Sequence, residues 1–439
     1  MNDFLFARSQ MGMSLGFHII FAAVGIGMPV LMTIAEGLYL RTGRPVYLEL
    51  AKRWARGSAI LFAVGAVSGT VLSFELGLLW PKFMEKAGAI IGMPFSLEGF
   101  AFFTEAIFLG VFLAGWNRLP PLLHWFSGLM VAIGGIASGI FVVTANAWMN
   151  MPAGFKVVGG KITDIDPMAA MLNPGSFHEV LHMTLAAFIG TGFAVAAVHA
   201  FFLLRDPRDQ FHRSAFGIAL SMACLSAPLQ LWSGDLSART VARLQPAKLA
   251  AMEANYRTQI GAPILIGGIP NDEARTTKYA VTIPHGLSLL VARDASAKVT
   301  GLEEFPRKDW PNVRLVHWSF DVMVASGLAM IFLSLAAGFL WWKHRRLPDG
   351  KWFLRGMVVA GPLGFIAIEA GWMVTELGRQ PWIIYNVMRT EEAVTPMPGI
   401  AVPFVVFTLI YIFLSLVLLY LLRREFMKEP EPTPDPHVT

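Results

Sequence analysis

The chain has 439 residues, of which 55% are hydrophobic and only 15% charged, whereas an ordinary soluble domain carries roughly 25% charged residues. This composition excludes a soluble domain and indicates an integral membrane protein. The formal net charge of +5 does not indicate a nucleic-acid partner, because Lys and Arg cluster in short stretches between apolar runs, as topology-determining charges do. The single cysteine, Cys224, excludes a disulfide framework and a thiolate metal site, so any metal must be held by His, Met or carboxylate groups.

Windows of about 20 mostly apolar residues are long enough to cross a bilayer. Nine such windows occur, at residues 12–38, 56–80, 95–116, 122–147, 180–204, 214–233, 315–342, 356–377 and 401–422. The predicted fold class is therefore an all-α integral membrane protein. The first residues lack the basic region, short apolar core and cleavage site of a signal peptide, so we expect the first span to be retained.

The loops after the first, fifth and seventh spans are the most basic, at residues 41–56, 205–213 and 343–355. By the positive-inside rule these loops are cytoplasmic, which places the N-terminus outside and the C-terminus in the cytoplasm.

Four segments follow along the chain. They are spans one to six (1–233), an outer-face lobe (234–314), spans seven to nine (315–422) and a Pro-rich, acidic cytoplasmic tail (423–439) that we expect to be disordered. Within the lobe, Pro246 opens a stretch, QPAKLAAMEANYRT, that predicts an amphipathic helix.

Ionisable groups inside a span cost about 2.5–3.5 kcal/mol at the helix centre, so each is a functional hypothesis. The expected orientation places five potential ligands or proton carriers in the outer half of the bilayer: His18, Glu98, His182, Met323 and Glu369. His, Met and carboxylate are side chains that ligate haem iron where cysteine is absent. The shared layer therefore predicts a haem site.

Alternatives remain open for the single residues. His18 could instead make an interhelical hydrogen bond, and Met323 could be ordinary packing. His178 lies four residues before His182, on the same helix face, but close enough to the span boundary to face water.

Glu98 and Glu105 are seven residues apart, so they share a helix face at about 10 Å along the axis. This spacing suits a proton relay, although neighbouring Ser, Asn or Trp groups could instead satisfy both carboxylates. Ser138 and Asn146 could continue a hydrogen-bonded path or serve as helix contacts.

Five stretches carry a resemblance to a known family. They are LEGFAFFTEAIFLG in span three, NAWMNMP ending span four, SFHEVLH opening span five, KLAAMEA in the lobe, and IEAGWMVTELGRQPW in span eight. In this order, on nine spans, they resemble subunit I of the cytochrome bd-type quinol oxidases. The lobe matches the family's Q loop in its short form, a type that includes cyanide-insensitive oxidases.

The resemblance implies ligands for three haems. Glu369 matches the carboxylate ligand of a high-spin haem, His18 matches the ligand of the other high-spin haem, and His182 and Met323 match the axial pair of the low-spin haem b. The high-spin sites would hold one haem b and either haem d or a further haem b. The surrounding signature adds cofactor-binding residues, namely Trp372, Arg379 and Gln380.

The resemblance also implies the reaction. Glu98 and Glu105 match acidic residues that lead protons to the oxygen-reducing haem, and Lys248 and Glu253 match Q-loop residues implicated in quinol oxidation. The implied enzyme oxidises quinol at the outer face of a bacterial inner membrane and reduces oxygen to water with cytoplasmic protons, so that it is electrogenic without pumping. The implied partners are a second membrane subunit, a small single-helix subunit, and the lipid bilayer.

Two residues depart from the family pattern. Asp321, two residues before Met323, stands where well-known members have Arg, which predicts an altered potential of the low-spin haem. Phe365, four residues before Glu369, stands where Trp is often found, which predicts a weaker electron route.

Two other functions stay open on the residues alone. One is a b-haem electron-transfer subunit without oxygen reduction. The other is a proton-coupled transporter, since buried carboxylates and histidines also form proton relays.

Overall fold

The computed structural model describes residues 3–394 and 398–426. Within these residues, nine helical segments are long and apolar enough to cross a membrane, which confirms the predicted fold class. They are α1 (Asp3–Thr42), α2 (Pro45–Leu79), α3 (Pro81–Gly115), α4 (Pro121–Asn150), α6 (Ser176–Leu203), α7 (Gln210–Leu244), α10 (Val313–His344), α11 (Lys351–Ala360) with α12 (Leu363–Arg379), and α14 (Ala401–Phe426).

Proline residues lie at the ends of several of these helices. Pro45, Pro81 and Pro121 each open a helix at its first position, where the missing N–H would have no partner and the fixed φ suits a helix. Pro362 separates α11 from α12, because proline lacks the N–H that the helix interior requires. The eighth span is therefore two helices in sequence.

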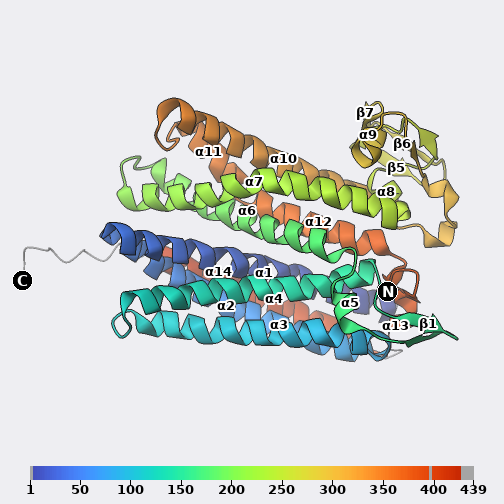
Figure 1. Ribbon diagram of the computed structural model, residues 1–439, viewed down its shortest axis with the longest axis horizontal. Coiled ribbons are helices and arrows are strands. Elements are labelled where there is room, and N and C mark those ends of the chain that lie inside the picture. Colours follow the sequence, from blue (N-terminus) through green and yellow to red (C-terminus); the bar gives the residue numbers. More distant parts are fainter. Residues whose placement is uncertain (1–2, 395–397, 427–439) are drawn as a thin grey trace, which may run out of the picture.

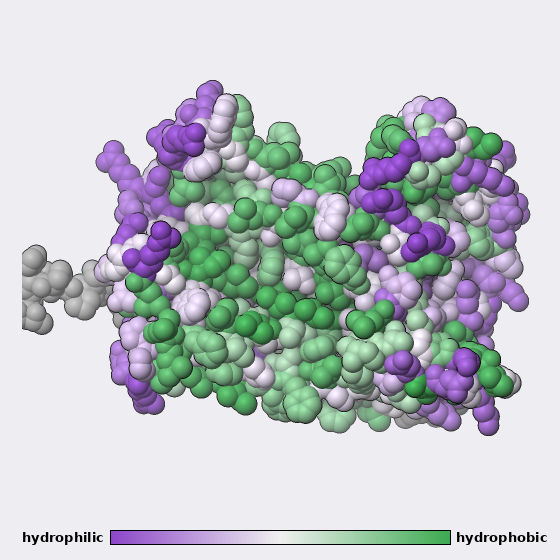
Figure 2. Space-filling model, viewed as in Figure 1, coloured by the Kyte–Doolittle hydropathy of each residue, from purple (hydrophilic) through white to green (hydrophobic). Residues whose placement is uncertain are grey.

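The long helices lie side by side in two bundles (Figure 1). The first bundle contains α1 to α4, and the second contains α6, α7, α10, α11 and α12. Contacts of α1 and α4 with α6 join the two, and α14 packs on α1 and α2. Figure 2 shows an apolar band around the middle of the molecule between two polar ends, as expected for a protein surrounded by lipid.

The lobe lies at one end of the bundles, which we call the lobe end (Figure 1). It consists of α8 (Pro246–Met252), α9 (Gly286–Ala292), two short 3₁₀ turns (Leu302–Glu304 and Arg307–Asp309) and three antiparallel strand pairs. The pairs are β3 (Gln259–Ile260) with β8 (Lys298–Val299), β4 (Ile264–Ile266) with β7 (Val281–Ile283), and β5 (Ile269–Asn271) with β6 (Thr276–Lys278).

Smaller elements close the same end of the molecule. They are the hairpin of β1 (Lys156–Val158) and β2 (Lys161–Thr163), the helices α5 (Pro167–Met171) and α13 (Thr390–Ala393), and the hairpin of β9 (Trp382–Ile384) and β10 (Met388–Arg389).

Several helix boundaries, and the character of one helix, differ from the sequence-based expectation. The helix of span six continues past residue 233 to Leu244, so the lobe is reached by a helical extension. α14 continues to Phe426, so residues 423–426 are helical, and residues 427–439 of the expected tail lie outside the described residues. The helix at Pro246 forms, but it is not amphipathic: Ala247 to Met252 are all buried, because the helix is enclosed by α7, α10 and α12.

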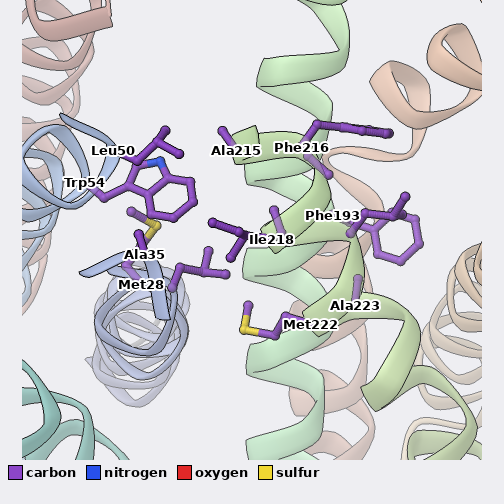
Figure 3. Packing of buried hydrophobic residues seen from close by; sticks show 14 of the residues in the cluster. Met28, Ala35, Leu50, Trp54, Phe193, Ala215, Phe216, Ile218, Met222 and Ala223 are labelled. Carbon is purple, nitrogen blue, oxygen red and sulfur yellow. The ribbon is translucent and has the colours of Figure 1, made fainter. Parts of the chain in front are cut away.

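The largest apolar cluster fills the space between the two bundles, toward the end opposite the lobe. Figure 3 shows Met28 and Ala35 of α1 and Trp54 of α2 facing Ile218 and Met222 of α7. Close backbone contact supports the second bundle, because a Cβ atom on Gly364 would lie 2.3 Å from Cα of Gly190. Small residues that let helices approach in this way are typical of membrane bundles. This packing fixes the relative positions of the helices that carry the polar residues.

Candidate functional site

The predicted ligands are divided between the two bundles. His18 lies on α1 in the first bundle, whereas His182, Met323 and Glu369 lie on α6, α10 and α12 in the second. Glu369 reaches the seam between the bundles, since its Oε2 lies 3.3 Å from the position that a Cβ on Gly16 of α1 would occupy. His18, His182 and Met323 are nearer the lobe end of their helices, and Glu369 is nearer the lobe end of the span that α11 and α12 form together, but Glu98 lies midway along α3. The single layer expected for all five is therefore only approximate.

His18 is held in one ring orientation by α2. Its Nδ1 lies 3.0 Å from Oγ of Ser68, and that hydroxyl donates to the carbonyl groups of Val64 and Gly65. Ser68 therefore accepts from Nδ1–H, which leaves a lone pair on Nε2. The ring sits against Gly69, where a Cβ would lie 3.0 Å from its Cε1. Histidines that ligate metals generally donate their other N–H in this way.

His182 has an equivalent arrangement with α7. Its Nδ1 lies 2.9 Å from Oγ of Ser233, whose hydroxyl donates to the carbonyl of Gln230, so Nδ1 is again the donor and Nε2 the free base. The side-chain amide of Gln230 lies 3.1 Å from Nε2. This amide must turn aside for Nε2 to bind a metal.

Met323 and Glu369 are the other two predicted ligands. Sδ of Met323 packs on Gly371 of α12, where a Cβ would lie at 2.9 Å. Oε1 of Glu369 is buried and has no hydrogen-bond partner among the described residues. A buried polar oxygen without a partner is costly. Glu369 is therefore a candidate to bind a group that is not part of the polypeptide.

The acidic pair on α3 packs against α4. Oγ of Ser138 donates to Oε1 of Glu98 at 3.0 Å. Glu105 is 7% exposed and fits where Gly134 and Gly135 let α4 approach, since a Cβ on Gly134 would lie 2.9 Å from that of Glu105. The Ser138 hydroxyl thus pairs with one of the two carboxylates, as both a proton path and a purely structural role would require, and Glu105 is the more deeply buried of the two.

The GRQPW stretch ends α12 with a buried cation. Arg379 is 2% exposed and donates from Nη2 to Glu376, which also accepts from Nδ2 of Asn146 at 2.6 Å. Nε and Nη1 of Arg379 have no partner among the described residues. A buried guanidinium with two free donors suits a ligand carboxylate, and haem carries such groups.

The other two predicted residues of this signature are Gln380 and Trp372. Gln380 accepts from Oγ1 of Thr390 at 2.8 Å, so its amide holds the β9–β10 hairpin. Trp372 is half-buried on α12.

Lys248 is buried on α8, the part of the lobe that packs against α7, α10 and α12. Its Nζ donates to Oδ1 of Asn150 at 3.1 Å, and Asn150 donates in turn to the backbone and side-chain oxygens of Asn146 at 3.1 Å. The stem of Lys248 packs on Gly378, where a Cβ would lie 2.9 Å from its Cγ. Burial lowers the pKa of the Lys248 ammonium, against the opposing effect of the Glu179 carboxylate. A continuous polar chain therefore leads from Lys248 to Glu376 and Arg379.

Glu253 follows α8 directly and is 2% exposed. Burial, reinforced by the negative charge of Asp321, raises the pKa of the Glu253 carboxyl to about 8.

His178 is also buried, at 5% exposure, with Nδ1 3.0 Å from Oγ of Ser237 and Nε2 without a partner among the described residues. The alternative that His178 faces water is therefore wrong.

The arrangement fits haem better than a bare metal ion. Within the described ranges, no group of three or more His, Cys, Asp or Glu side chains could hold a metal ion, whereas haem iron needs only one or two protein ligands. The unpartnered atoms of Glu369 and Arg379 would suit an iron ligand and a carboxylate-binding group. Sequence reasoning missed Ser68, Ser233 and Asn150, because a polar side chain on a neighbouring helix gives no local signal.

Comparison with known proteins decides the family. Residues 6–430 match the family model described as Cytochrome bd terminal oxidase subunit I. The chain belongs to this family. As a cytochrome bd subunit I it is an oxidoreductase of the respiratory membrane that carries haem and has a subunit II as its partner. The transporter alternative is thereby excluded.

Individual relatives cover almost the whole chain. A Bacillus subtilis (strain 168) protein named as a cytochrome bd menaquinol oxidase subunit I is 38% identical over 437 residues, 98% of each chain. The cytochrome bd ubiquinol oxidase subunit 1 of the same organism is 32% identical, over 98% of this chain and 95% of its own. The structure of the bd oxidase from Geobacillus thermodenitrificans superposes with a TM-score of 0.91 at 37% identity, covering 98% of this chain and 99% of the other.

Asn150 is expected to be energetically coupled to Lys248. An Asn150→Leu variant removes the acceptor of a fully buried ammonium, which should lower the free energy of unfolding by about 1–3 kcal/mol. In a Lys248→Met background the same change should cost less than half as much. The measurement is thermal unfolding of the four proteins of this double-mutant cycle in detergent. Additive costs would contradict the coupling.

Proposed function

We propose that this subunit oxidises quinol beneath the lobe, at the outer face of a bacterial cytoplasmic membrane, and reduces oxygen to water with cytoplasmic protons. The separation of its titratable groups along the bundle carries the proposal. Lys248 and Glu253 lie at the base of the lobe, whereas Glu105 lies ten residues before the opposite end of α3 at Gly115, or about 15 Å along the axis.

This separation has an electrical consequence. Protons released by quinol leave on the lobe side, and protons consumed in water formation enter from the opposite side. Each turnover therefore moves charge across the membrane without a pump, and each charge stores about 2.3 kcal/mol per 100 mV. The proposed orientation, with the N-terminus outside and the C-terminus cytoplasmic, agrees with the basic loops at the end opposite the lobe.

Three haem sites follow from the ligands. His182 and Met323 would hold a low-spin haem b, and His18 and Glu369 would each hold a high-spin haem, one of them haem b and the other haem d or a further haem b. The lone pair on Nε2 of His18, the same lone pair on His182 once the Gln230 amide has turned aside, and the unpartnered Oε1 of Glu369 support these roles. Haem supplies the electron transfer and the oxygen chemistry.

The protein supplies the proton routes. Glu105 would take protons from the cytoplasmic side and pass them toward Glu98 and Ser138, which are already hydrogen-bonded to each other. On the lobe side, Lys248 would donate a hydrogen bond to a quinol oxygen, and Glu253 would accept a proton as quinol is oxidised.

Apolar helix faces support two membrane partners. Large hydrophobic side chains are exposed along α2, α3, α10 and α14, among them Phe74, Phe100, Phe103, Phe332 and Phe413. Lipid covers part of this surface, and the second subunit and a small single-helix subunit would cover the rest.

Replacing Glu105 by Gln is expected to reduce quinol-dependent oxygen uptake of the purified complex by about 10²-fold, because a positioned proton carrier typically contributes 10²–10⁴-fold. Reduction of the haems by dithionite should be unchanged. Glu85→Gln on the same helix, at an exposed position, is the matched control. Full oxygen uptake in Glu105→Gln would contradict the proposed proton route.

The pH profile should report Glu253. Because the carboxylate form accepts the proton, kcat/KM for quinol should rise with pH and level off near pH 8, the raised pKa of Glu253. Well below that pH the slope should approach about tenfold per pH unit. Glu253→Gln should be slow and lack this rise, whereas Glu273→Gln, at an exposed lobe position, should keep it. An unchanged rise in Glu253→Gln would exclude this role.

A further inference from the structure

The turn between β4 and β5 is held by a membrane-spanning helix. It contains Gly267 and Gly268, with φ of +67° and +87°, a region open to glycine but strained for other residues. Three side chains of α10 bind this turn: His317, Trp318 and Asp321. Nε1 of Trp318 donates to the carbonyl of Gly268 at 2.9 Å. This turn of the lobe is therefore tied to α10.

His317 bridges two segments of the lobe. It is 0% exposed, with Nδ1 2.7 Å from the carbonyl oxygen of Met252 and Nε2 2.8 Å from that of Gly267. Carbonyl oxygens only accept hydrogen bonds, so both contacts are hydrogen bonds only when each ring nitrogen carries a proton, as in the imidazolium form. A fully buried cation is costly unless a counter-charge is close.

Asp321 supplies that counter-charge. It lies one helical turn beyond His317, and its Oδ2 is 3.5 Å from Nε2 of the imidazole. The same oxygen accepts from the backbone N–H of Gly267 at 2.7 Å. The carboxylate that replaces the family's arginine is thus directed to the lobe turn.

These contacts join two functional segments. Met252 is the last residue of α8, the helix that carries Lys248, and it directly precedes Glu253. Asp321 is two residues before Met323. We propose that His317 and Asp321 form a charged latch that positions the quinol-site residues of the lobe against the helix bearing the low-spin haem ligand. They are positioning residues for quinol oxidation, and this role rests on the function proposed above.

The latch predicts a specific kinetic change. His317→Gln cannot bridge both carbonyl groups, so KM for a short-chain quinol should rise by about tenfold. Asp321→Asn keeps an acceptor for Gly267 but removes the counter-charge, so its rise should be smaller, about threefold, when KM is measured above pH 8, where Glu253 is ionised with or without the Asp321 charge. Neither variant should change kcat at saturating quinol, oxygen uptake with an artificial one-electron donor, or the midpoint potential of the low-spin haem.

The control is His344→Gln, the same change at an exposed position near the end of α10, which should leave KM unchanged. Normal KM in His317→Gln with full haem content would overturn the latch. If His317→Gln fails to retain haem, the Asp321→Asn variant tests the latch in its place. A shifted haem potential with unchanged KM in that variant would show that Asp321 acts on the haem and would overturn the latch. Absence of quinol-dependent oxygen uptake in the unmodified complex would refute the proposed function itself. That outcome is distinct from the two variant results that would overturn the latch.

Discussion

Polar side chains buried within an apolar bundle need partners, and this constraint governs the molecule. Neither lipid nor packed apolar side chains can satisfy an unpaired donor or acceptor. Most buried polar groups here are paired across helices, as in the chain from Lys248 through Asn150 and Asn146 to Glu376. Among the buried atoms without a partner in the described part of the chain are Oε1 of Glu369 and two donors of Arg379, and both residues belong to the proposed haem sites. The same physical rule thus accounts for the internal network and supports the proposed positions of the haems.

Glycines make the close helix contacts that this arrangement needs. The missing side chain of Gly134 leaves space for Glu105 against α4. Gly69 leaves space for the ring of His18, and Gly371 leaves space for the sulfur of Met323. Each lies opposite a side chain with a proposed chemical role. Small residues therefore serve both helix packing and the placement of ligands and proton carriers, which ties the function to the fold at the level of single side chains.

The sequence predicted the fold well, because hydropathy follows directly from the cost of exposing polar backbone to lipid. Motif resemblance supplied the candidate active residues, whose roles stay predictions, and Ser138 does donate a hydrogen bond to Glu98. It could not predict Ser68, Ser233 or Asn150 as partners, since these depend on how neighbouring helices are rotated. Asp321 illustrates the same limit: its identity suggested an effect on a haem, whereas its carboxylate lies on the lobe turn.

The most direct test of this account is a dithionite-reduced minus air-oxidised visible spectrum of the purified complex, with pyridine haemochrome analysis of the same sample. The account predicts b-type bands from a low-spin haem held by His182 and Met323, together with high-spin haem, whether or not a red chlorin band accompanies them. Loss of the low-spin signal in His182→Ala would support the ligand assignment. A complex without haem, or a low-spin band that survives in His182→Ala, would contradict it.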